Sequence, residues 1–286
     1  MKIALLGYRG FIGRSLLNSP TFSKDDFLLI GASQAIWEME KDIRNNFLNC
    51  DAIIWAAGKV NPRLAEFRPD LVRKEFDDFT NILNFITEGT RSVYPKFVFL
   101  SSGGCTYTAD RPPFREEDQA LGVNLYGKMK IDLENSLADK IPNSVSARLS
   151  NIYGPGQPSG RGQGVIAEWF STLQSGGALK VFGDLGSSRD YLHIDDTIDA
   201  IRILAGGEVT GVVNVGSGVQ TTLQDLIKIF RKVSRTNLNF EFNSKRIFDR
   251  SAYYLSVEKA KDKLGWSPKI VLESGIKSLL DTLAQE

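Results

Sequence analysis

Three glycines near the N-terminus constrain the fold of this 286-residue chain more than any other feature. The segment GYRGFIG, residues 7–13, follows the apolar run of residues 2–6 and precedes the helical pattern of residues 11–18. In a strand–turn–helix unit, the first glycine permits the tight turn, the second lets the backbone approach a diphosphate, and the third allows close packing of helix on strand. The helix N-terminus then offers N–H groups to phosphate. The spacing therefore predicts a dinucleotide site at Gly7, Gly10 and Gly13.

Near-continuous apolar runs of strand length recur along the first half of the chain. They occupy residues 2–6, 27–30, 51–57, 96–100 and 145–149. Such runs are typical of strands covered on both faces, and helix-length segments at 64–87 and 119–139 separate them. The alternation predicts an α/β fold with a Rossmann-type doubly wound parallel sheet.

The interval between the second and third runs is short for a full strand–helix–strand–helix passage. Residues 36–44 in this interval, IWEMEKDIR, are compatible with either a strand or a helix. The adenosine pocket of the predicted dinucleotide site is therefore the part that the sequence defines least.

The local amino-acid composition changes after residue 152. The segment YGPGQPSGRGQG at 153–164 is dense in Gly and Pro and predicts a loop. Helical patterns follow at 166–173, 195–205, 222–234, 257–264 and 272–284. We expect a dinucleotide-binding domain made of residues 1–152 with 187–215, and a smaller α/β substrate domain made of residues 153–186 with 216–286.

Composition narrows the classes of function. The formal net charge is +1, which does not favour nucleic acid or an anionic membrane as partner. No apolar run approaches the ~20 residues that span a bilayer, and the N-terminal run lacks the length and cleavage site of a signal peptide. One histidine and two cysteines make neither a metal cluster nor a disulfide framework. We expect a reduced, cytoplasmic, metal-free protein.

The end of the second apolar run bears on the choice of cofactor. Sites that prefer NAD place an acid there to bind the ribose 2′-hydroxyl, but this run ends LIGAS with no acid. Arg9 in the glycine turn and Ser33 are instead suited to a 2′-phosphate. The choice between NAD and NADP stays open, and these two residues favour NADP.

A tyrosine and a lysine lie four residues apart in YGKMK, residues 126–130. On a helix this spacing places Tyr126 and Lys130 on one face, one turn apart. A neighbouring ammonium, together with a cationic nicotinamide, favours the phenolate and lowers the pKa of a tyrosine. Such a tyrosine exchanges protons with a sugar hydroxyl near neutral pH. Ser101 and Ser102 follow an apolar strand, at the sheet edge where ligands bind.

In this order, the motifs make the chain resemble the extended short-chain dehydrogenases/reductases, and within them the NAD-dependent epimerase/dehydratase group that acts on nucleotide sugars. The resemblance covers nearly the whole length. Besides the glycine turn and YGKMK it includes DAIIWAAG at 51–58, FLSSGGCTY at 99–107, ARLSNIYGPGQ at 147–157, GDLGSSRDYLHIDD at 183–196 and KAKDKLGWSP at 259–268.

The resemblance implies roles for individual residues. Tyr126 is the acid/base, Lys130 lowers its pKa, and the third member is Ser102, with Ser101 less favoured and Gly103 as a further possible position of the usual hydroxyl. The implied cofactor contacts are Gly7, Arg9, Gly10, Phe11, Ile12, Gly13, Ser33, Asp42, Ile43, Ala56, Ala57, Gly58, Tyr126 and Lys130. Asp42 and Ile43 are candidate adenine contacts or simply part of a helix.

A nucleoside-diphosphate sugar is the implied substrate. Arginine binds diphosphate oxygens through paired hydrogen bonds, and Arg189 and Arg246 match diphosphate-binding positions of the family, with Asp249 three residues after the latter. Asn151 matches a substrate contact. His193, the single histidine, and the acids Asp190 and Asp196 are expected to support the fold. Helices 64–87 and 119–139 resemble the pair that forms a homodimer interface in this family.

Three reactions at sugar C4 fit the resemblance. A 4,6-dehydratase needs an acidic pair after the catalytic hydroxyl, and Gly103-Gly104 stand there, so we reject that reaction. A 4-epimerase is slightly favoured by the motifs at 147–157 and 187–196. An NADPH-dependent 4-ketoreductase follows closely, because of Arg9 and the absent acid. A non-catalytic dinucleotide sensor is a remote alternative that the Ser/Tyr/Lys set disfavours.

Overall fold

The structure is a computed structural model that describes residues 1–286 except 32–33, 89–92, 161–163, 235–236, 245–251 and 284–286. Its centre is a six-stranded parallel sheet in the order β2-β1-β3-β4-β5-β10. The strands are β1 (Ile3–Leu6), β2 (Phe27–Ile30), β3 (Ala52–Trp55), β4 (Lys96–Ser102), β5 (Ser144–Leu149) and β10 (Gly211–Val215). Apart from exposed or half-buried positions in β2 and β10, these strands are almost wholly buried, as their continuous apolar runs predict.

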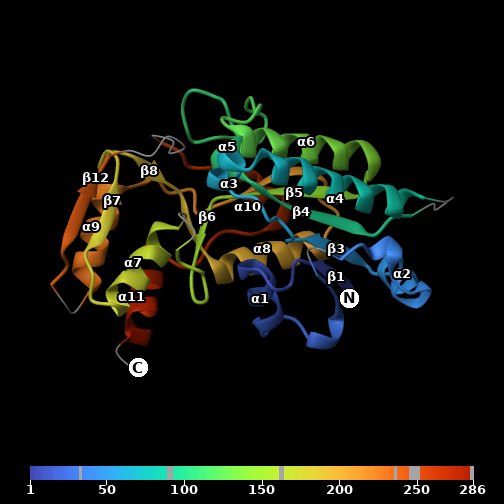
Figure 1. Ribbon diagram of the computed structural model, residues 1–286, viewed down its shortest axis with the longest axis horizontal. Helices are drawn as coiled ribbons and strands as arrows, with labels where there is room; N and C mark the ends of the chain where they lie inside the picture. Colours follow the sequence, from blue (N-terminus) through green and yellow to red (C-terminus); the bar gives the residue numbers. More distant parts are fainter. Residues whose placement is uncertain (32–33, 89–92, 161–163, 235–236, 245–251, 284–286) are drawn as a thin grey trace.

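Helices cover both faces of this sheet (Figure 1). One face carries α1 (Phe11–Asn18), α8 (Ile194–Gly206) and α10 (Glu258–Leu264), which share a core with Leu5, Ile54 and Val213. The other face carries α2 (Lys41–Leu48), α4 (Pro69–Thr87) and α6 (Leu125–Lys140), whose core is rich in aromatic rings around Phe79. The fold is therefore the expected α/β doubly wound sheet.

The strand order reverses between β1 and β3. The chain passes from β1 outward to β2, and then returns to place β3 on the other side of β1. In open α/β sheets, ligands bind at the carboxyl ends of the strands at such a switch point. In the described part of the chain, β2 is the edge strand. The connection from β2 to β3 holds the short 3-10 turn η2 (Ile36–Glu38) and α2, so residues 36–44 form helical structure rather than a strand.

A smaller unit lies beyond the carboxyl ends of the strands, at the left of Figure 1. It contains α7 (Val165–Gln174), α9 (Leu223–Val233) and α11 (Leu272–Leu283), packed around Trp169 and Phe230. Three short strand pairs complete it or join it to the main body. They are β6 (Asn151–Tyr153) with β9 (Tyr191–His193), β7 (Leu179–Phe182) with β12 (Phe240–Asn243), and β8 (Ser188–Arg189) with β11 (Thr221–Thr222).

Two predicted helices differ from the observed ones. The segment 64–87 is divided into α3 (Pro62–Phe67) and α4, because Pro69 lacks the N–H that a continuous helix needs at this position. In the segment 119–139 the helix begins only at Leu125, because Asn124 caps it by accepting the Gly127 N–H. The short helices η1 (Lys24–Asp26) and α5 (Gly103–Thr106) were not predicted.

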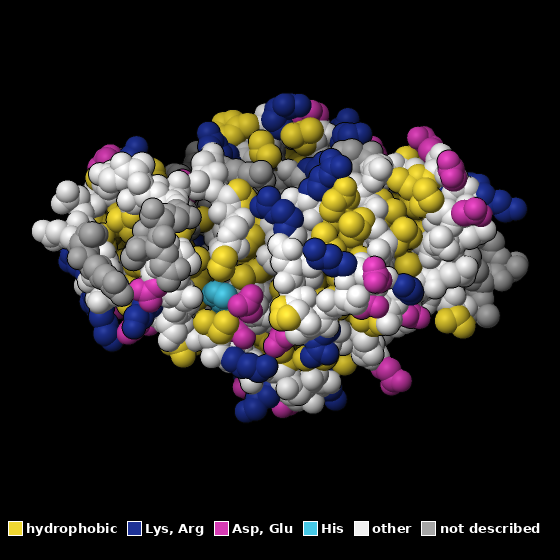
Figure 2. Space-filling model, turned by 90° about the horizontal axis from the view of Figure 1, so that it is seen from below, with side chains coloured by type: hydrophobic (Ala, Val, Ile, Leu, Met, Phe, Trp, Pro, Cys, Tyr) yellow, Lys and Arg dark blue, Asp and Glu magenta, His cyan; other side chains and the backbone are white. Residues whose placement is uncertain are grey.

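The proposed division into two domains stays a prediction, although residues near 260 pack differently from that division. Ala260 and Trp266 belong to the core of the large sheet rather than to the smaller unit. Basic and acidic side chains are interspersed on the face shown in Figure 2, which agrees with the small net charge. Among the described helices, none has the length and apolarity needed to cross a membrane.

Candidate active site

The glycine turn makes the contacts that its spacing predicts. Gly7 has φ +86, and a Cβ there would lie 2.4 Å from the Ala56 carbonyl oxygen. A Cβ on Gly13 would lie 2.5 Å from the Gly7 carbonyl oxygen, so no side chain fits between turn and helix. Gly7 donates its N–H to Ile30 at 3.0 Å, which ties the turn to the end of β2.

The N-terminus of α1 lies directly after this turn. Gly10 is its N-cap residue, no side chain caps it, and its first turn holds no acid. The first N–H groups of a helix have no intrahelical partner, and they favour an anion. The turn and this helix end therefore fit the diphosphate of a dinucleotide. Arg9 lies exposed in the turn, where its Nε donates to the Tyr8 hydroxyl at 3.0 Å.

A cavity of about 460 Å³ lies between the carboxyl ends of the large sheet and the smaller unit. Ile12 of α1 and Ala56 and Gly58 after β3 line the end near the glycine turn. Other predicted site residues in its wall are Ser101, Ser102, Tyr126, Lys130, Asn151 and Arg189. The fold thus brings together side chains that are up to 177 residues apart in the chain (from Ile12 to Arg189).

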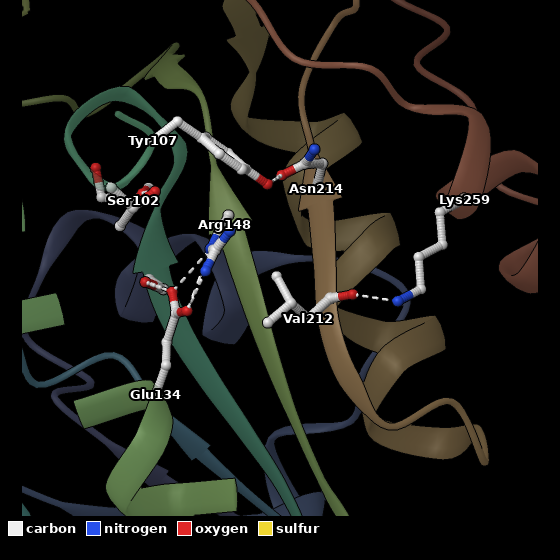
Figure 3. A network of polar contacts seen from close by, with 9 residues as sticks. Ser102, Tyr107, Glu134, Arg148, Val212, Asn214 and Lys259 are labelled. Carbon is white, nitrogen blue, oxygen red and sulfur yellow. Dashed lines mark hydrogen bonds and ion pairs between the residues drawn. The ribbon is translucent and has the colours of Figure 1, made fainter. Parts of the chain in front are cut away.

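The two adjacent serines at the end of β4 have different surroundings. The hydroxyl of Ser101 is buried and donates to Glu134 Oε1 on α6. Glu134 in turn forms a buried ion pair with Arg148 on β5, with Nη2 and Oε2 2.6 Å apart (Figure 3). Ser102 is half-buried, lines the cavity beside Tyr126 and acts to lower the Tyr126 pKa. The geometry therefore favours Ser102 over Ser101 as the hydroxyl that faces a ligand.

Tyr126 and Lys130 lie one turn apart on α6, as the spacing predicts. The Lys130 ammonium is 5.5 Å from the centre of the Tyr126 ring and 5.0 Å from that of Phe99. Lys130 acts to lower the Tyr126 pKa, as expected, but the net shift is in the opposite direction. Burial raises the Tyr126 pKa above its ordinary value, and this outweighs the lowering effect of Lys130, while Cys105 and Glu75 act to raise it further.

A buried glutamate that the sequence did not point out completes this group. Glu75 on α4 places Oε1 3.3 Å from the Lys130 ammonium, and both side chains are 3% exposed. Its other oxygen accepts the N–H groups of Lys59 and Val60, at 2.8 and 2.9 Å. Burial opposes the charge on Lys130, yet the charges of Tyr126 and Glu75 raise the Lys130 pKa above its ordinary value.

The remaining predicted site residues fall into three groups. Phe11 begins α1, and Ala57 is buried next to the cavity-lining Ala56. Asp42 and Ile43 lie in α2, with Asp42 exposed and Ile43 packed on the second core, and neither lines the cavity. The predicted contacts at Ser33, Arg246 and Asp249 lie outside the described residues.

The single histidine and its neighbouring acids support the fold, as expected. His193 caps α8, with Nδ1 accepting the Asp195 N–H at 3.2 Å, and burial lowers its pKa. Asp190 is fully buried and accepts the N–H groups of Ser217, Gly218 and Leu255. Asp196 accepts the N–H groups of Lys269 and Ile270, just before α11.

The burial of Glu75 could have been predicted from its position in the sequence, although it lies in a run of charged residues. The run RKEFDD at 73–78 is typical of a solvated helix face. However, Glu75 occupies the i+4 position between Leu71 and Phe79, on the stripe that turns toward the core. An acid on an apolar stripe indicates a buried partner. Tyr253, which also lines the cavity, had no comparable signal.

Comparisons with known proteins agree with this geometry. The model of the NAD dependent epimerase/dehydratase family matches residues 3–216. A dTDP-4-dehydro-6-deoxyglucose reductase of Escherichia coli is 30% identical over 203 residues, which are 66% of this chain and 61% of that reductase. The chain therefore spans less than two thirds of that relative's length.

Two further proteins match over nearly their full length. A UDP-glucose 4-epimerase of Mycolicibacterium smegmatis is 27% identical, with 98% of each chain covered. A solved structure of the UDP-glucose 4-epimerase of Thermotoga maritima, with UDP-glucose, superposes with a TM-score of 0.84 at 23% identity, covering 100% of this chain and 99% of that one. The latter likeness supports the fold.

Proposed function

Since the chain belongs to the NAD-dependent epimerase/dehydratase family, we propose that it oxidises or reduces C4 of a nucleotide sugar through a 4-keto species. The observation that carries this proposal is the position of Ser102, Tyr126 and Lys130. All three line one cavity with Ile12, Ala56 and Gly58, next to the glycine turn. A dinucleotide bound at the turn would supply the hydride acceptor or donor for this reaction.

In the proposed reaction, the Tyr126 hydroxyl exchanges a proton with the oxygen on sugar C4. Ser102, which lines the cavity with Tyr126, donates to the same oxygen as it gains or loses negative charge. Lys130 stabilises the phenolate while the proton is on the sugar oxygen. In this proposal the three side chains supply a proton donor, a hydrogen-bond donor and a positive charge, which together suffice for the proton transfer.

The substrate's nucleoside diphosphate is proposed to lie toward the smaller unit. Arg189 of β8 and Asn151 of β6 line that side of the cavity, and the planar guanidinium of arginine suits diphosphate oxygens. Arg246 and Asp249 are proposed as further contacts. The absence of acids at Gly103 and Gly104 again disfavours elimination of water across C5–C6.

The two reactions that remain are 4-epimerisation and 4-keto reduction. The full-length similarity to UDP-glucose 4-epimerases supports the first, which the sequence motifs also favour. The connection between β2 and β3 supports the second. It adds no strand outside β2 among the described residues, so η2 and α2 are the elements that follow β2 and could help to hold the cofactor there. Weak retention of the cofactor suits a reductase, because a reductase must release its oxidised cofactor.

The deciding experiment incubates purified protein with UDP-, dTDP- and GDP-hexoses and their 4-keto forms, with and without added NADPH. Interconversion of stereoisomers without added reductant identifies the epimerase. Turnover only of a keto sugar with NADPH identifies the reductase. If no sugar is converted under either condition, the enzymatic proposal fails and the dinucleotide sensor is left.

Tyr126→Phe tests the proton-transfer role. We expect the rate to fall by roughly 10²–10⁴, the usual contribution of a positioned acid or base, while a fluorescence titration shows dinucleotide binding retained. Tyr94→Phe is the matched control, because Tyr94 is partly buried on the second core and does not line the cavity. Full activity of Tyr126→Phe would contradict the proposal.

A further inference from the structure

Glu75, Lys130 and Tyr126 form a compact group of ionisable side chains on two neighbouring helices. Glu75 on α4 pairs with Lys130 on α6, and Lys130 faces the Tyr126 ring one turn earlier on the same helix. The proposed reaction gives roles to Tyr126 and Lys130 and leaves Glu75 without one. A buried glutamate in direct contact with a proposed catalytic lysine requires an explanation.

The contacts of Glu75 hold it rigidly in place. Both of its oxygens have partners: Oε1 has Lys130 at 3.3 Å, and Oε2 has the N–H groups of Lys59 and Val60. These N–H groups follow directly after Gly58, which lines the cavity. Glu75 therefore fixes the position of Lys130 and of the chain segment after β3 together.

The charge of this group is nearly balanced. The ammonium of Lys130 and the carboxylate of Glu75 are both excluded from water, so water screens neither charge from Tyr126. The Glu134 carboxylate also acts on Lys130, but Arg148 neutralises it at 2.6 Å. Of the other groups near Tyr126, Cys105 acts to raise its pKa and Ser102 acts to lower it. Glu75 is thus the unshared counter-charge to Lys130.

We propose that Glu75 balances the charge of Lys130 and so, together with the burial of Tyr126, keeps this tyrosine as a proton-donating phenol in the resting site. This inference rests on the proposed function and makes Glu75 a positioning residue, since it acts through Lys130. A protonated Tyr126 is the form that donates a proton to the oxygen of a 4-keto sugar. The arrangement therefore favours the reduction of the keto species over the oxidation of the alcohol.

Glu75→Gln tests this inference. The amide keeps the shape of the side chain and an oxygen for the backbone N–H groups, and it removes the negative charge. Keto reduction needs the phenol, so its rate falls as pH rises through the Tyr126 pKa. Without the carboxylate that pKa falls, and we expect the alkaline limb of keto reduction to move to lower pH by about one unit or more.

A titration without cofactor gives a second readout. The difference in phenolate absorbance between the wild type and Tyr126→Phe reports the ionisation of Tyr126 alone. In the wild type we expect this ionisation above the ordinary value of about 10, and in Glu75→Gln, measured against Glu75→Gln/Tyr126→Phe, at lower pH. Ionisation of wild-type Tyr126 near neutral pH would overturn the inference, whether or not Glu75→Gln folds.

Asp78→Asn is the matched control. Asp78 lies on α4, three residues after Glu75, and pairs with Lys59 and Lys74 at the surface. This variant should leave both the pH limb and the phenol ionisation unchanged. If the Glu75→Gln limb stays in place or moves to higher pH while the wild type is active, the inference is wrong and the proposed function stands. If the wild type converts no sugar, the proposed function fails, and the absorbance titration still tests Glu75.

Discussion

Two adjacent residues at this site differ in the contacts that their side chains make. Ser101 and Ser102 both line the cavity, yet the buried Ser101 hydroxyl donates to Glu134, which pairs with Arg148, whereas Ser102 is half-buried. The other networks of Figure 3, Tyr107 with Asn214 and Lys259 with the Val212 carbonyl, likewise join β10 to its surroundings. The buried polar residues drawn in Figure 3 thus tie neighbouring strands and helices together.

Arg9 is the residue that bears on cofactor choice. It lies exposed in the glycine turn. The strand β2 ends at Ile30, and the residue that follows it is Gly31 rather than an acid. Arg9→Ala should weaken NADPH binding roughly tenfold, the worth of a hydrogen bond to a charged group, and leave NADH binding nearly unchanged. Fluorescence titration of both nucleotides measures this. Arg73→Ala, an exposed site on α4, is the control.

The outcome that would contradict this prediction is specific. If the wild type binds NADH tightly and NADPH negligibly, Arg9 does not receive a 2′-phosphate, and the preference for NADP is wrong. If Arg9→Ala weakens the binding of both nucleotides equally, Arg9 stabilises the turn or contacts the diphosphate rather than the 2′-phosphate.

At the scale of elements, α6 presents the proposed catalytic pair, and its N-terminus determines where that pair lies. Asn124 lies two residues before Tyr126. It caps the helix by accepting a 2.8 Å hydrogen bond from the Gly127 N–H. The helical pattern of the sequence extends the helix back to residue 119. In the structure the helix begins only at Leu125, because the Asn124 side chain accepts one of the first N–H groups of the helix there.

Asn124→Ala should therefore destabilise the protein by about 1 kcal/mol, the usual effect of losing an N-cap. Urea unfolding followed by circular dichroism measures the free energy of unfolding. Asn45→Ala, on the exposed side of α2, should change it by less than about 0.5 kcal/mol. Equal values for the wild type and Asn124→Ala would show that the cap contributes nothing.

At the scale of the whole molecule, α4 and α6 lie side by side over one face of the sheet (Figure 1). They correspond to the helix pair expected at a homodimer interface. Large apolar side chains are exposed near the ends of these helices, including Phe67 and Leu121. We expect light scattering to give a mass of about twice the 31.7 kDa of the chain. A monomeric mass at micromolar concentration would contradict the dimer.

The sequence by itself determined the parallel sheet, the glycine turn and the Tyr126–Lys130 face. Each of these depends on a local period or on a backbone contact that only glycine permits. Tertiary contacts were needed to show that Ser101 donates to Glu134, that residues 36–44 add no strand, and that Glu75 pairs with Lys130. Those outcomes depend on which side chains meet across 33 to 55 residues of chain, and on the burial of their charges. A local sequence pattern can indicate that an acid such as Glu75 is buried, but it does not identify the partner, because the sheet brings the two side chains together only after it has formed.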